Sequence, residues 1–319
     1  MTTARGALKL FTGNGSVELA RKVAEQLRVP VSDALVGAWS NGETRVQLNE
    51  NVRGADVFIL QSFGTSVNDR VMELLLMLDA AKRASASRIT AVVPYYPYST
   101  QERKVRAREP ISARVFADLM VHCGADRALT IELHAGAIQS FFGVPVDHLP
   151  ILPIAAKHLR ERGIGGPDWV VVAPDEGAVD RSGKLADALG SDVAVIFKRH
   201  PEEAPEEVET VEVVGEFEGK RALIHDDIIF RGSTLVNAAG IVMNRGATEV
   251  HAFVTHGVLC GDGPRTIRDS ALAGLILTDT VPLRIDPKEY RIHVMTVAPF
   301  LAEAIGRIHE DASVSEMLH

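Results

Sequence analysis

Residues 221–235 read RALIHDDIIFRGSTL and form the most informative stretch of the sequence. An apolar run delivers two adjacent acids, Asp226 and Asp227, into a short loop that opens a helical pattern. A strand, a small-residue loop and a helix in succession form the repeating unit of α/β folds. The carboxylates can bind sugar hydroxyls or a hydrated cation. The loop that follows consists of Gly232, Ser233 and Thr234. At a helix N-terminus it can bind a phosphate through its backbone N–H groups and its two hydroxyls. The pattern indicates a phosphorylated sugar as ligand, with a plain solvated turn as the alternative.

The composition is that of a globular chain. With 319 residues and 46% hydrophobic content, the chain can bury one large core or two ordinary ones. The net charge of −8 argues against a nucleic-acid-binding face. The N-terminus lacks a signal-peptide pattern, and no stretch approaches the roughly 20 apolar residues that a membrane span needs. We therefore expect a cytoplasmic protein that binds neither nucleic acid nor membrane. Two cysteines, far apart, indicate neither a disulfide framework nor a thiolate metal site.

Short β-rich runs alternate with helical patterns along the chain, which predicts mainly parallel sheets with helices on both faces. The expected strands are residues 8–12, 57–61, 89–94, 128–132, 170–174, 222–227 and 250–255, and the expected helices are 16–27, 71–83, 113–121 and 235–244. Residues 56–95 and 221–258 share one layout of strand, small-residue loop, helix, basic turn and strand. An internal duplication would explain this, and so would chance recurrence of a common unit. We place the domain division at 148/149, within a Pro-marked stretch.

Other candidate site residues follow further predicted strands. His134 could ligate a cation or hydrogen-bond a phosphate, although capping or packing is the alternative. Asp175 ends a strand and Gly177 lets the backbone approach an oxyanion closely, but an ordinary acidic N-cap has the same pattern. Lys198 and Arg199 end a strand just before a polar, Pro-containing segment. Cations on a closing loop can neutralise a transferring phosphoryl group, and a solvated basic turn is the alternative.

Two segments of the first half suit a nucleotide. A polar turn between two strand-like runs holds Trp39, Asn41 and Glu43. Residues 94–104 combine three tyrosines with Gln101 and Arg103. Aromatic, amide and cationic groups together can bind a nucleotide base and its phosphates. The tyrosines could equally form the packed wall at the end of a strand.

In this order the segments resemble the ribose-phosphate pyrophosphokinase family, also called phosphoribosyl pyrophosphate synthetases, over nearly the whole chain. The matching stretches are WSNGETRVQLNENVRG (39–54), PYYPYSTQERKVRAREPISARVFADL (94–119), ELHAGAIQSFFGVPVDHL (132–149), VAPDEGAVDRSGKLA (172–186), FKRH (197–200), HDDIIFRGST (225–234), VTHGVLCG (254–261) and SVSEML (313–318). The resemblance implies two tandem phosphoribosyltransferase-like domains, residues 1–148 and 149–319, with the C-terminal tail packing back on the first. It also implies a homo-oligomer, usually a hexamer, in which a neighbouring subunit completes the ATP site.

The activity implied by the resemblance is transfer of the β,γ-diphosphoryl group of Mg-ATP to the 1-hydroxyl of ribose 5-phosphate. By their positions in the family motifs, Lys198 and Arg199 would be catalytic, while His134 and Asp175 would be associated with Mg²⁺. The ribose 5-phosphate site would comprise Asp226, Asp227, Arg231, Gly232, Ser233 and Thr234. The ATP site would comprise Trp39, Asn41, Glu43, Gln101 and Arg103. Mg²⁺ would bridge phosphate oxygens with few protein ligands.

The chain departs from the family pattern at five positions. In the loop after the two acids, Phe230 replaces a third acid, Arg231 a threonine and Ser233 a glycine. Phe230 cannot accept a hydrogen bond from a sugar hydroxyl, and Ser233 should resist a backbone geometry that glycine adopts freely. Arg231 could instead hold the 5-phosphate bidentately. Thr100 stands where an arginine is usual, and Asp180, where a lysine is common, would repel the diphosphate unless it faces solvent.

Three functions therefore stay open from the sequence: an active diphosphokinase, a weak or inactive regulatory homologue, and a phosphoribosyltransferase, which would have no use for the ATP motifs. Regulation by phosphate as activator or by ADP is also open. The stretches that resemble the family's regulatory surface contain Arg53, Arg83, Arg103 and residues 313–315.

Overall fold

The computed structural model describes residues 6–199 and 210–318, which form two compact units. The first unit comprises the described residues of Met1–Pro150, Thr280–Pro282 and Thr296–His319, and the second those of Ile151–Asp279 and Leu283–Met295. The chain leaves the first unit two residues after the division that we placed at 148/149. The described residues of Thr296–His319, at the end of the chain, belong to the first unit again.

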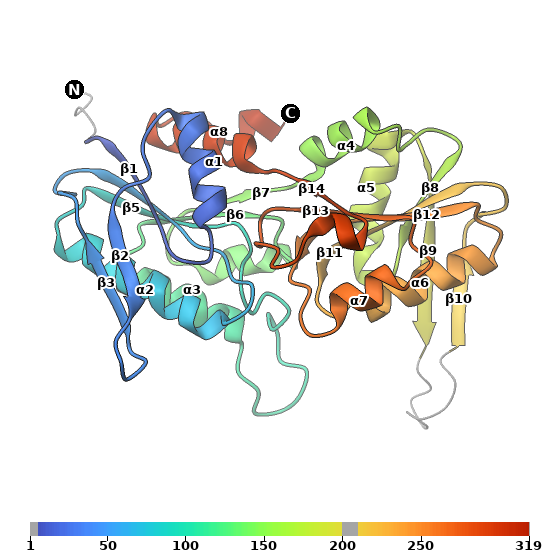
Figure 1. Cartoon of the computed structure of the whole chain (residues 1–319), viewed down its shortest axis with the longest axis horizontal. Coiled ribbons are helices and arrows are strands. Elements are labelled where there is room, and N and C mark those ends of the chain that lie inside the picture. Colours follow the sequence, from blue (N-terminus) through green and yellow to red (C-terminus); the bar gives the residue numbers. More distant parts are fainter. Residues whose placement is uncertain (1–5, 200–209, 319) are drawn as a thin grey trace. The chain divides into compact units, whose positions relative to one another are not determined.

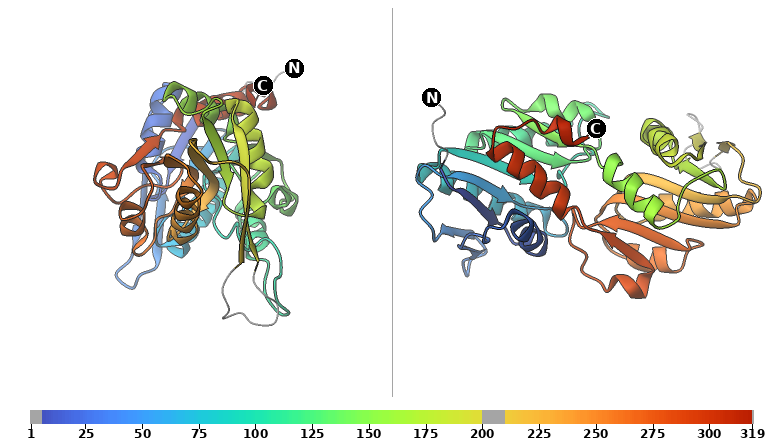
Figure 2. Two further views of the ribbon diagram at one scale, coloured as in Figure 1. Left: turned by 90° about the vertical axis from the view of Figure 1, so that its right-hand side faces the viewer. Right: turned by 90° about the horizontal axis from the view of Figure 1, so that it is seen from above.

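The first unit is built on a parallel sheet with the strand order β1-β4-β5-β6-β7. The strands are β1 (Leu8–Thr12), β4 (Asp56–Leu60), β5 (Arg88–Val93), β6 (Arg127–Ile131) and β7 (Val146–Leu149). Figures 1 and 2 show α1 (Val17–Leu27) and α8 (Ala298–His309) on one face, and α2 (Val67–Arg83) and α3 (Ser112–Cys123) on the other. An antiparallel hairpin, β2 (Ala34–Ala38) and β3 (Thr44–Leu48), packs against α2. Two 3-10 helices are η1 (Gly136–Phe141) and η4 (Ser315–Leu318).

The second unit has a larger sheet with the order β10-β9-β8-β11-β12-β13-β14, in which only the β10–β9 pair is antiparallel. The strands are β8 (Trp169–Ala173), β9 (Asp192–Arg199), β10 (Thr210–Val214), β11 (Arg221–Ile229), β12 (Glu249–Gly257), β13 (Gly274–Thr278) and β14 (Ile292–Met295). The helices α4 (Leu152–Glu161) and α5 (Val179–Leu189) cover one face, and α6 (Ser233–Asn244) and α7 (Gly263–Arg268) the other (Figure 1). Short 3-10 helices are η2 (Glu176–Ala178) and η3 (Pro287–Tyr290).

Burial of the central strands fixes the loops that follow them. Every residue of β4 and of β8 is buried, because helices cover both faces of each sheet. In the second unit, Val172 of β8 and Ile224 of β11 join Leu235, Ala238 and Val242 of α6 in one hydrophobic core. The packing of α6 on β11 therefore holds the loop between them in a defined place.

The fold class predicted from the sequence is confirmed, since both sheets are mainly parallel and flanked by helices. All the expected strands and helices are present, with ends that differ by at most four residues. The layout shared by residues 56–95 and 221–258 is observed as two parallel β-α-β units, β4-α2-β5 and β11-α6-β12. Among residues 6–199 and 210–318, no helix is both long and apolar enough to cross a membrane.

Candidate functional site

A cavity of about 430 Å³ lies in the second unit where β8 and β11 end. Its lining includes Asp175, which lies two residues after β8, Asp226 on β11, and the loop from Phe230 into the first turn of α6. Parallel sheets gather the carboxyl ends of their strands at one edge, where α/β proteins bind ligands. The structure thus brings together most of the predicted ribose 5-phosphate residues and one of the two predicted metal residues.

The two acids of β11 face in opposite directions. The sequence suggested that the strand ends at Asp227, but β11 continues to Ile229 because its ladder with β12 continues to Gly257. Side chains alternate along a strand, so only Asp226 lines the cavity. The Asp227 side chain is 3% exposed and forms an ion pair with Arg181 of α5. The structure thus places Asp226 in the cavity lining and Asp227 beside Arg181, and the binding role that the family motif implies for Asp227 stays a prediction.

Asp226 sits in an electrostatically unfavourable place. Burial raises the pKa of Asp226 above that of an ordinary aspartate, and the neighbouring charges of Asp227 and Asp175 raise it further, against the opposing effect of Arg181. A bound cation, or hydrogen bonds from hydroxyl groups, would stabilise the charged form of a carboxylate in this environment. On the same strand, burial lowers the pKa of His225 to about 3, so this ring is neutral and belongs to the core.

The loop between β11 and α6 turns at Gly232. This residue has φ +80°, and a Cβ here would lie 2.9 Å from Cδ1 of Ile267. Ser233 then begins α6 with an ordinary helical φ, so the expected backbone resistance at this position is wrong. The first N–H of α6 that bonds within the helix is that of Val236, which donates to the Gly232 carbonyl at 2.9 Å. Ser233, Thr234 and Leu235, whose N–H groups come before that bond, are lining residues of the cavity, and a helix N-terminus suits an anion.

Arg231 and Phe230 also line the cavity, and both are exposed. A guanidinium beside a helix N-terminus strengthens an anion site, because it adds a forked pair of charged donors to the backbone N–H groups. Phe230, 40% exposed, offers an apolar surface and no hydrogen-bond acceptor in its side chain.

Asp175 begins η2 as its N-cap. Its Oδ1 accepts a hydrogen bond from the Ala178 N–H at 3.1 Å, so the acidic N-cap considered from the sequence is present. The second carboxylate oxygen has no role in that cap. One turn later, Asp180 pairs with Lys184 at 2.7 Å, and its side chain is 81% exposed. Asp180 therefore faces solvent and does not add negative charge to the cavity.

Sequence reasoning missed Arg181, and the sequence carries no signal for it. Arg181 precedes Ser182, which is fully buried, in a helix whose inward positions include Leu185 and Ala186. The same pattern occurs at Lys184, which precedes buried Leu185 and is itself exposed. The partner of Arg181 lies 46 residues later in the chain, and only the tertiary structure shows which acid that is.

His134 lies in the first unit, in the loop between β6 and η1. The loop is shaped by Glu132, which has φ +40°, and by the Leu133 N–H, which donates to Nε2 of His148 at 3.0 Å. The two predicted metal residues, His134 and Asp175, thus belong to different units. The predicted catalytic side chains, those of Lys198 and Arg199 at the end of β9, lie outside the described part of the chain.

The hairpin of the first unit holds the predicted nucleotide residues Trp39, Asn41 and Glu43. The Trp39 ring is 53% exposed, with the guanidinium carbon of Arg45 4.3 Å from its centroid. Asn41 Oδ1 accepts from the Glu43 N–H at 3.1 Å, which holds the turn. The hairpin therefore presents an aromatic ring and a cation on its surface.

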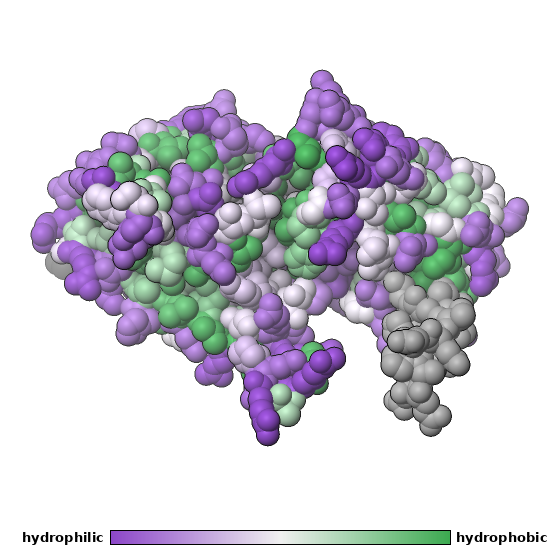
Figure 3. Space-filling view, turned by 60° about the horizontal axis from the view of Figure 1, so that its bottom comes forward, coloured by the Kyte–Doolittle hydropathy of each residue, from purple (hydrophilic) through white to green (hydrophobic). Residues whose placement is uncertain are grey.

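The segment after β5 divides into a packed part and an exposed part. Tyr95 and Tyr96 are buried, and Tyr96 donates to the Ala113 carbonyl at 2.7 Å, so these two form the packed wall considered from the sequence. Gln101 Oε1 accepts from the Ser112 hydroxyl at 2.7 Å, and the Arg103 side chain is 81% exposed. Figure 3 shows the stretch from residue 101 to 110 as a hydrophilic projection.

Comparison with known proteins gives consistent matches. Residues 8–124 match the model of the N-terminal domain of ribose phosphate pyrophosphokinase, and residues 191–319 match that of the phosphoribosyl synthetase-associated domain. The chain is 46% identical to the ribose-phosphate pyrophosphokinase of Clostridium acetobutylicum, over 97% of each chain. It is also 46% identical to that of Caldanaerobacter subterraneus, over 98% of each. The crystal structure of phosphoribosylpyrophosphate synthetase from Mycobacterium smegmatis superposes with a TM-score of 0.88 at 38% identity, covering 96% of this chain and 100% of that one.

Proposed function

The chain belongs to the ribose-phosphate pyrophosphokinase family, and from this premise we propose that the cavity of β11 and α6 binds ribose 5-phosphate. The chain is an enzyme of this kind and synthesises phosphoribosyl pyrophosphate. In the proposed reaction the 1-oxygen of the sugar forms a bond to the β-phosphorus of ATP. The bond from that phosphorus to the oxygen bridging to the α-phosphate breaks, and AMP and a proton are released.

The arrangement of the cavity lining supports this assignment. The 5-phosphate would bind the free N–H groups at the start of α6 and the guanidinium of Arg231. The sugar hydroxyls would donate to Asp226, whose carboxylate forms no ion pair with any side chain that the structure describes. Asp227, held by Arg181, would contribute its negative charge from inside the strand.

The donor set suits a magnesium ion that arrives with the substrates. Among the described residues, no three His, Cys, Asp or Glu side chains gather into a cluster that could hold a metal alone. Mg²⁺ is usually bound by one or two carboxylates together with waters and substrate phosphates. Asp175 and Asp226 supply two carboxylates at the cavity, and His134 is a further candidate ligand. When bound, the ion would neutralise phosphate charge; the residues of the chain would bind and orient the sugar.

The remaining roles rest on the family motifs. Lys198 and Arg199 would stabilise negative charge on the transferring group. Trp39, Asn41, Glu43, Gln101 and Arg103 would bind ATP, and the exposed Trp39 ring suits a site completed by a second copy of the chain. We therefore include a homo-oligomer, most simply a hexamer, and a phosphate activator site in the proposal.

Phosphorus NMR tests this function directly. Purified protein with ATP, Mg²⁺, phosphate and ribose 5-phosphate should yield AMP and a sugar 1-diphosphate in equal amounts. Asp226→Asn should abolish both products, while Asp180→Asn, which removes the same charge from a solvent-facing position on α5, should keep them. Lys198→Ala should reduce turnover far more than ATP affinity. An absence of both products from the wild-type protein, with ATP and ribose 5-phosphate still bound, would contradict the proposal.

A further inference from the structure

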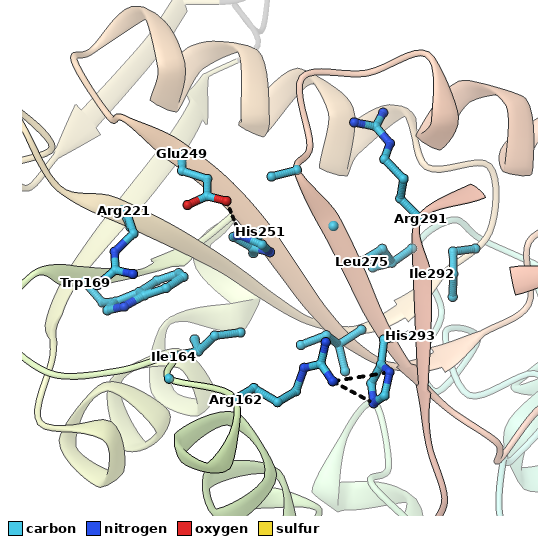
Figure 4. A pocket seen from close by; sticks show the side chains of 14 residues that line it. Arg162, Ile164, Trp169, Arg221, Glu249, His251, Leu275, Arg291, Ile292 and His293 are labelled. Atoms are coloured by element: carbon cyan, nitrogen blue, oxygen red, sulfur yellow. Dashed lines mark hydrogen bonds and ion pairs between the residues drawn. The ribbon is translucent and has the colours of Figure 1, made fainter. Parts of the chain in front are cut away.

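The second unit has another cavity, of about 460 Å³, formed by the first residues of its strands (Figure 4). Trp169 opens β8, Arg221 opens β11 and Glu249 opens β12. In the ladders Arg221 is paired with Trp169 on one side and with Glu249 on the other. The candidate substrate site follows the carboxyl ends of β8 and β11, so this cavity lies at the opposite edge of the same sheet. The reaction proposed above does not use it.

Two guanidinium groups face this cavity. The guanidinium carbon of Arg221 lies 4.6 Å from the centroid of the Trp169 ring, and an Nη of Arg162 lies 3.3 Å from Nε2 of His293. Figure 4 shows the Arg221 side chain lying on the Trp169 ring and the Arg162 side chain reaching toward His293, both at the border of the hollow. Within the described residues, neither arginine forms an ion pair with a carboxylate. A third arginine, Arg291, donates to the carbonyls of Arg268 and Ser270 and points away.

The lining carries a surplus of positive charge. Glu249 supplies a carboxylate, but it is engaged with Nε2 of His251 at 2.8 Å. Burial lowers the pKa of His293, and the charge of Arg162 lowers it further, so the cavity already disfavours additional positive charge. In a chain with a net charge of −8, a concave site lined by cations concentrates anions.

Trp169 takes part in the cavity through its ring. The guanidinium of Arg221 lies over that ring, which holds the arginine at the cavity wall. The Nε1–H of Trp169 is shielded from solvent, and so from a ligand in the cavity, and it has no hydrogen-bond acceptor among the described residues.

Size and the apolar floor narrow the ligand class. Small-molecule sites typically span roughly 300 to 1,000 Å³, which is more room than an inorganic phosphate needs. Ile164, Leu275 and Ile292 supply the apolar floor of the cavity. We propose that this cavity binds a phosphate monoester with a partly apolar body, of about the size of a nucleoside monophosphate. Arg221 and Arg162 would hold its anionic group and the floor would hold its body.

Trp169 itself can report binding. The chain has two tryptophans, so a Trp39→Phe background leaves the Trp169 indole as the single signal in a ¹⁵N-edited NMR spectrum. Titration with AMP should shift this signal saturably. Adenosine, which lacks the phosphate, and inorganic phosphate, which lacks the body, should each bind at least tenfold more weakly. Inorganic phosphate binding as tightly as AMP would overturn the assignment of an organic ligand.

Matched variants assign the shift to this cavity. Arg221→Gln and Arg162→Gln should each weaken AMP at least tenfold, while Arg291→Gln, which removes the same charge from a side chain that points away, should change affinity less than threefold. Arg221→Lys keeps the charge but loses the planar fork, and it should fall between wild type and Arg221→Gln. The proposal is overturned if AMP produces no saturable shift, or if all these variants respond as the wild type does.

Discussion

Replacing Arg181 by methionine should destabilise the second unit through charge more than through packing. The Arg181 and Asp227 side chains are 17% and 3% exposed, so they form a buried ion pair. Removing one partner of such a pair typically costs about 3–5 kcal/mol, because the other charge stays buried. The buried acid can limit this cost by taking up a proton. For an aspartate of ordinary pKa, about 3.9, uptake at pH 7 costs about 1.4 kcal/mol for each of roughly three pH units, or about 4 kcal/mol.

The penalty should therefore depend on pH with a definite sign. In the variant the folded state binds the proton more tightly than the unfolded chain does, so stability falls as pH rises above about 3.9. The penalty at pH 5 should be smaller than at pH 7 by about 2.7 kcal/mol. Urea unfolding followed by Trp169 fluorescence in a Trp39→Phe background measures this for the second unit alone.

Two comparisons make the test specific. Lys184→Met removes the exposed partner of Asp180 on the same helix and should cost at most about 0.5 kcal/mol. Arg181→Met combined with Asp227→Leu should recover most of the lost stability, because a buried ion pair can be replaced by apolar groups of similar volume. A penalty for Arg181→Met that is equal at pH 5 and pH 7 would refute the reasoning and show that lost packing dominates.

Three further perturbations test the site and its supports. Arg231→Gln should raise the KM for ribose 5-phosphate at least tenfold in steady-state kinetics, since a charged hydrogen bond contributes about 1.5–3 kcal/mol. Arg245→Gln, at the other end of α6, should leave the KM unchanged. An unchanged KM for Arg231→Gln would mean that the backbone alone binds the phosphate. Gly232→Ala should lower the free energy of unfolding in urea by about 1–3 kcal/mol, because of the positive φ and the contact that a Cβ would make with Ile267. Ser233→Ala should lower it by less than about 0.5 kcal/mol. Equal losses would contradict the assignment of the turn to Gly232. Burial lowers the pKa of His148, whose Nε2 accepts a hydrogen bond, so the unfolded chain binds the proton more readily and stability should fall as pH drops through and below about 6.5. His148→Gln should flatten this slope and His122→Gln, on an exposed part of α3, should not, as thermal unfolding across pH 5 to 8 would measure.

The sequence predicts the order of strands and helices well, because strands that are buried on both faces consist of consecutive apolar residues. It predicts their ends less well. At β11 the run looked complete at Asp227, yet Ile228 and Ile229 pair with His256 and Gly257 and extend the strand. The extension preserves the direction of each side chain, and alternation along the predicted strand 222–227 already implies that the two acids lie on opposite faces. The sequence does not show which of these faces carries the cavity and which carries Arg181.

The effect of single substitutions in the loop also depended on local geometry that the sequence did not contain. A serine in place of a glycine is costly where φ is positive and nearly free at the first position of a helix. Only the structure distinguishes the two, with the positive φ at Gly232 and the helix beginning at Ser233. Likewise, Asp180 would repel a diphosphate if it faced the cavity, but its pairing with Lys184 turns it to solvent.

The two cavities described in the second unit differ in how readily their lining residues can be recognised in the sequence. The residues at the carboxyl edge are contiguous, because one loop carries most of them, so they can be read as a motif. Those at the amino edge are single residues at the starts of separate strands, such as Trp169 and Arg221, and they become neighbours only through the strand order. Trp169 starts the strand that Asp175 follows, and Arg221 starts the strand that carries Asp226. β8 and β11 thus connect the two edges, and if the ligands at these edges influence each other, linkage requires that each change the affinity of the other by the same factor.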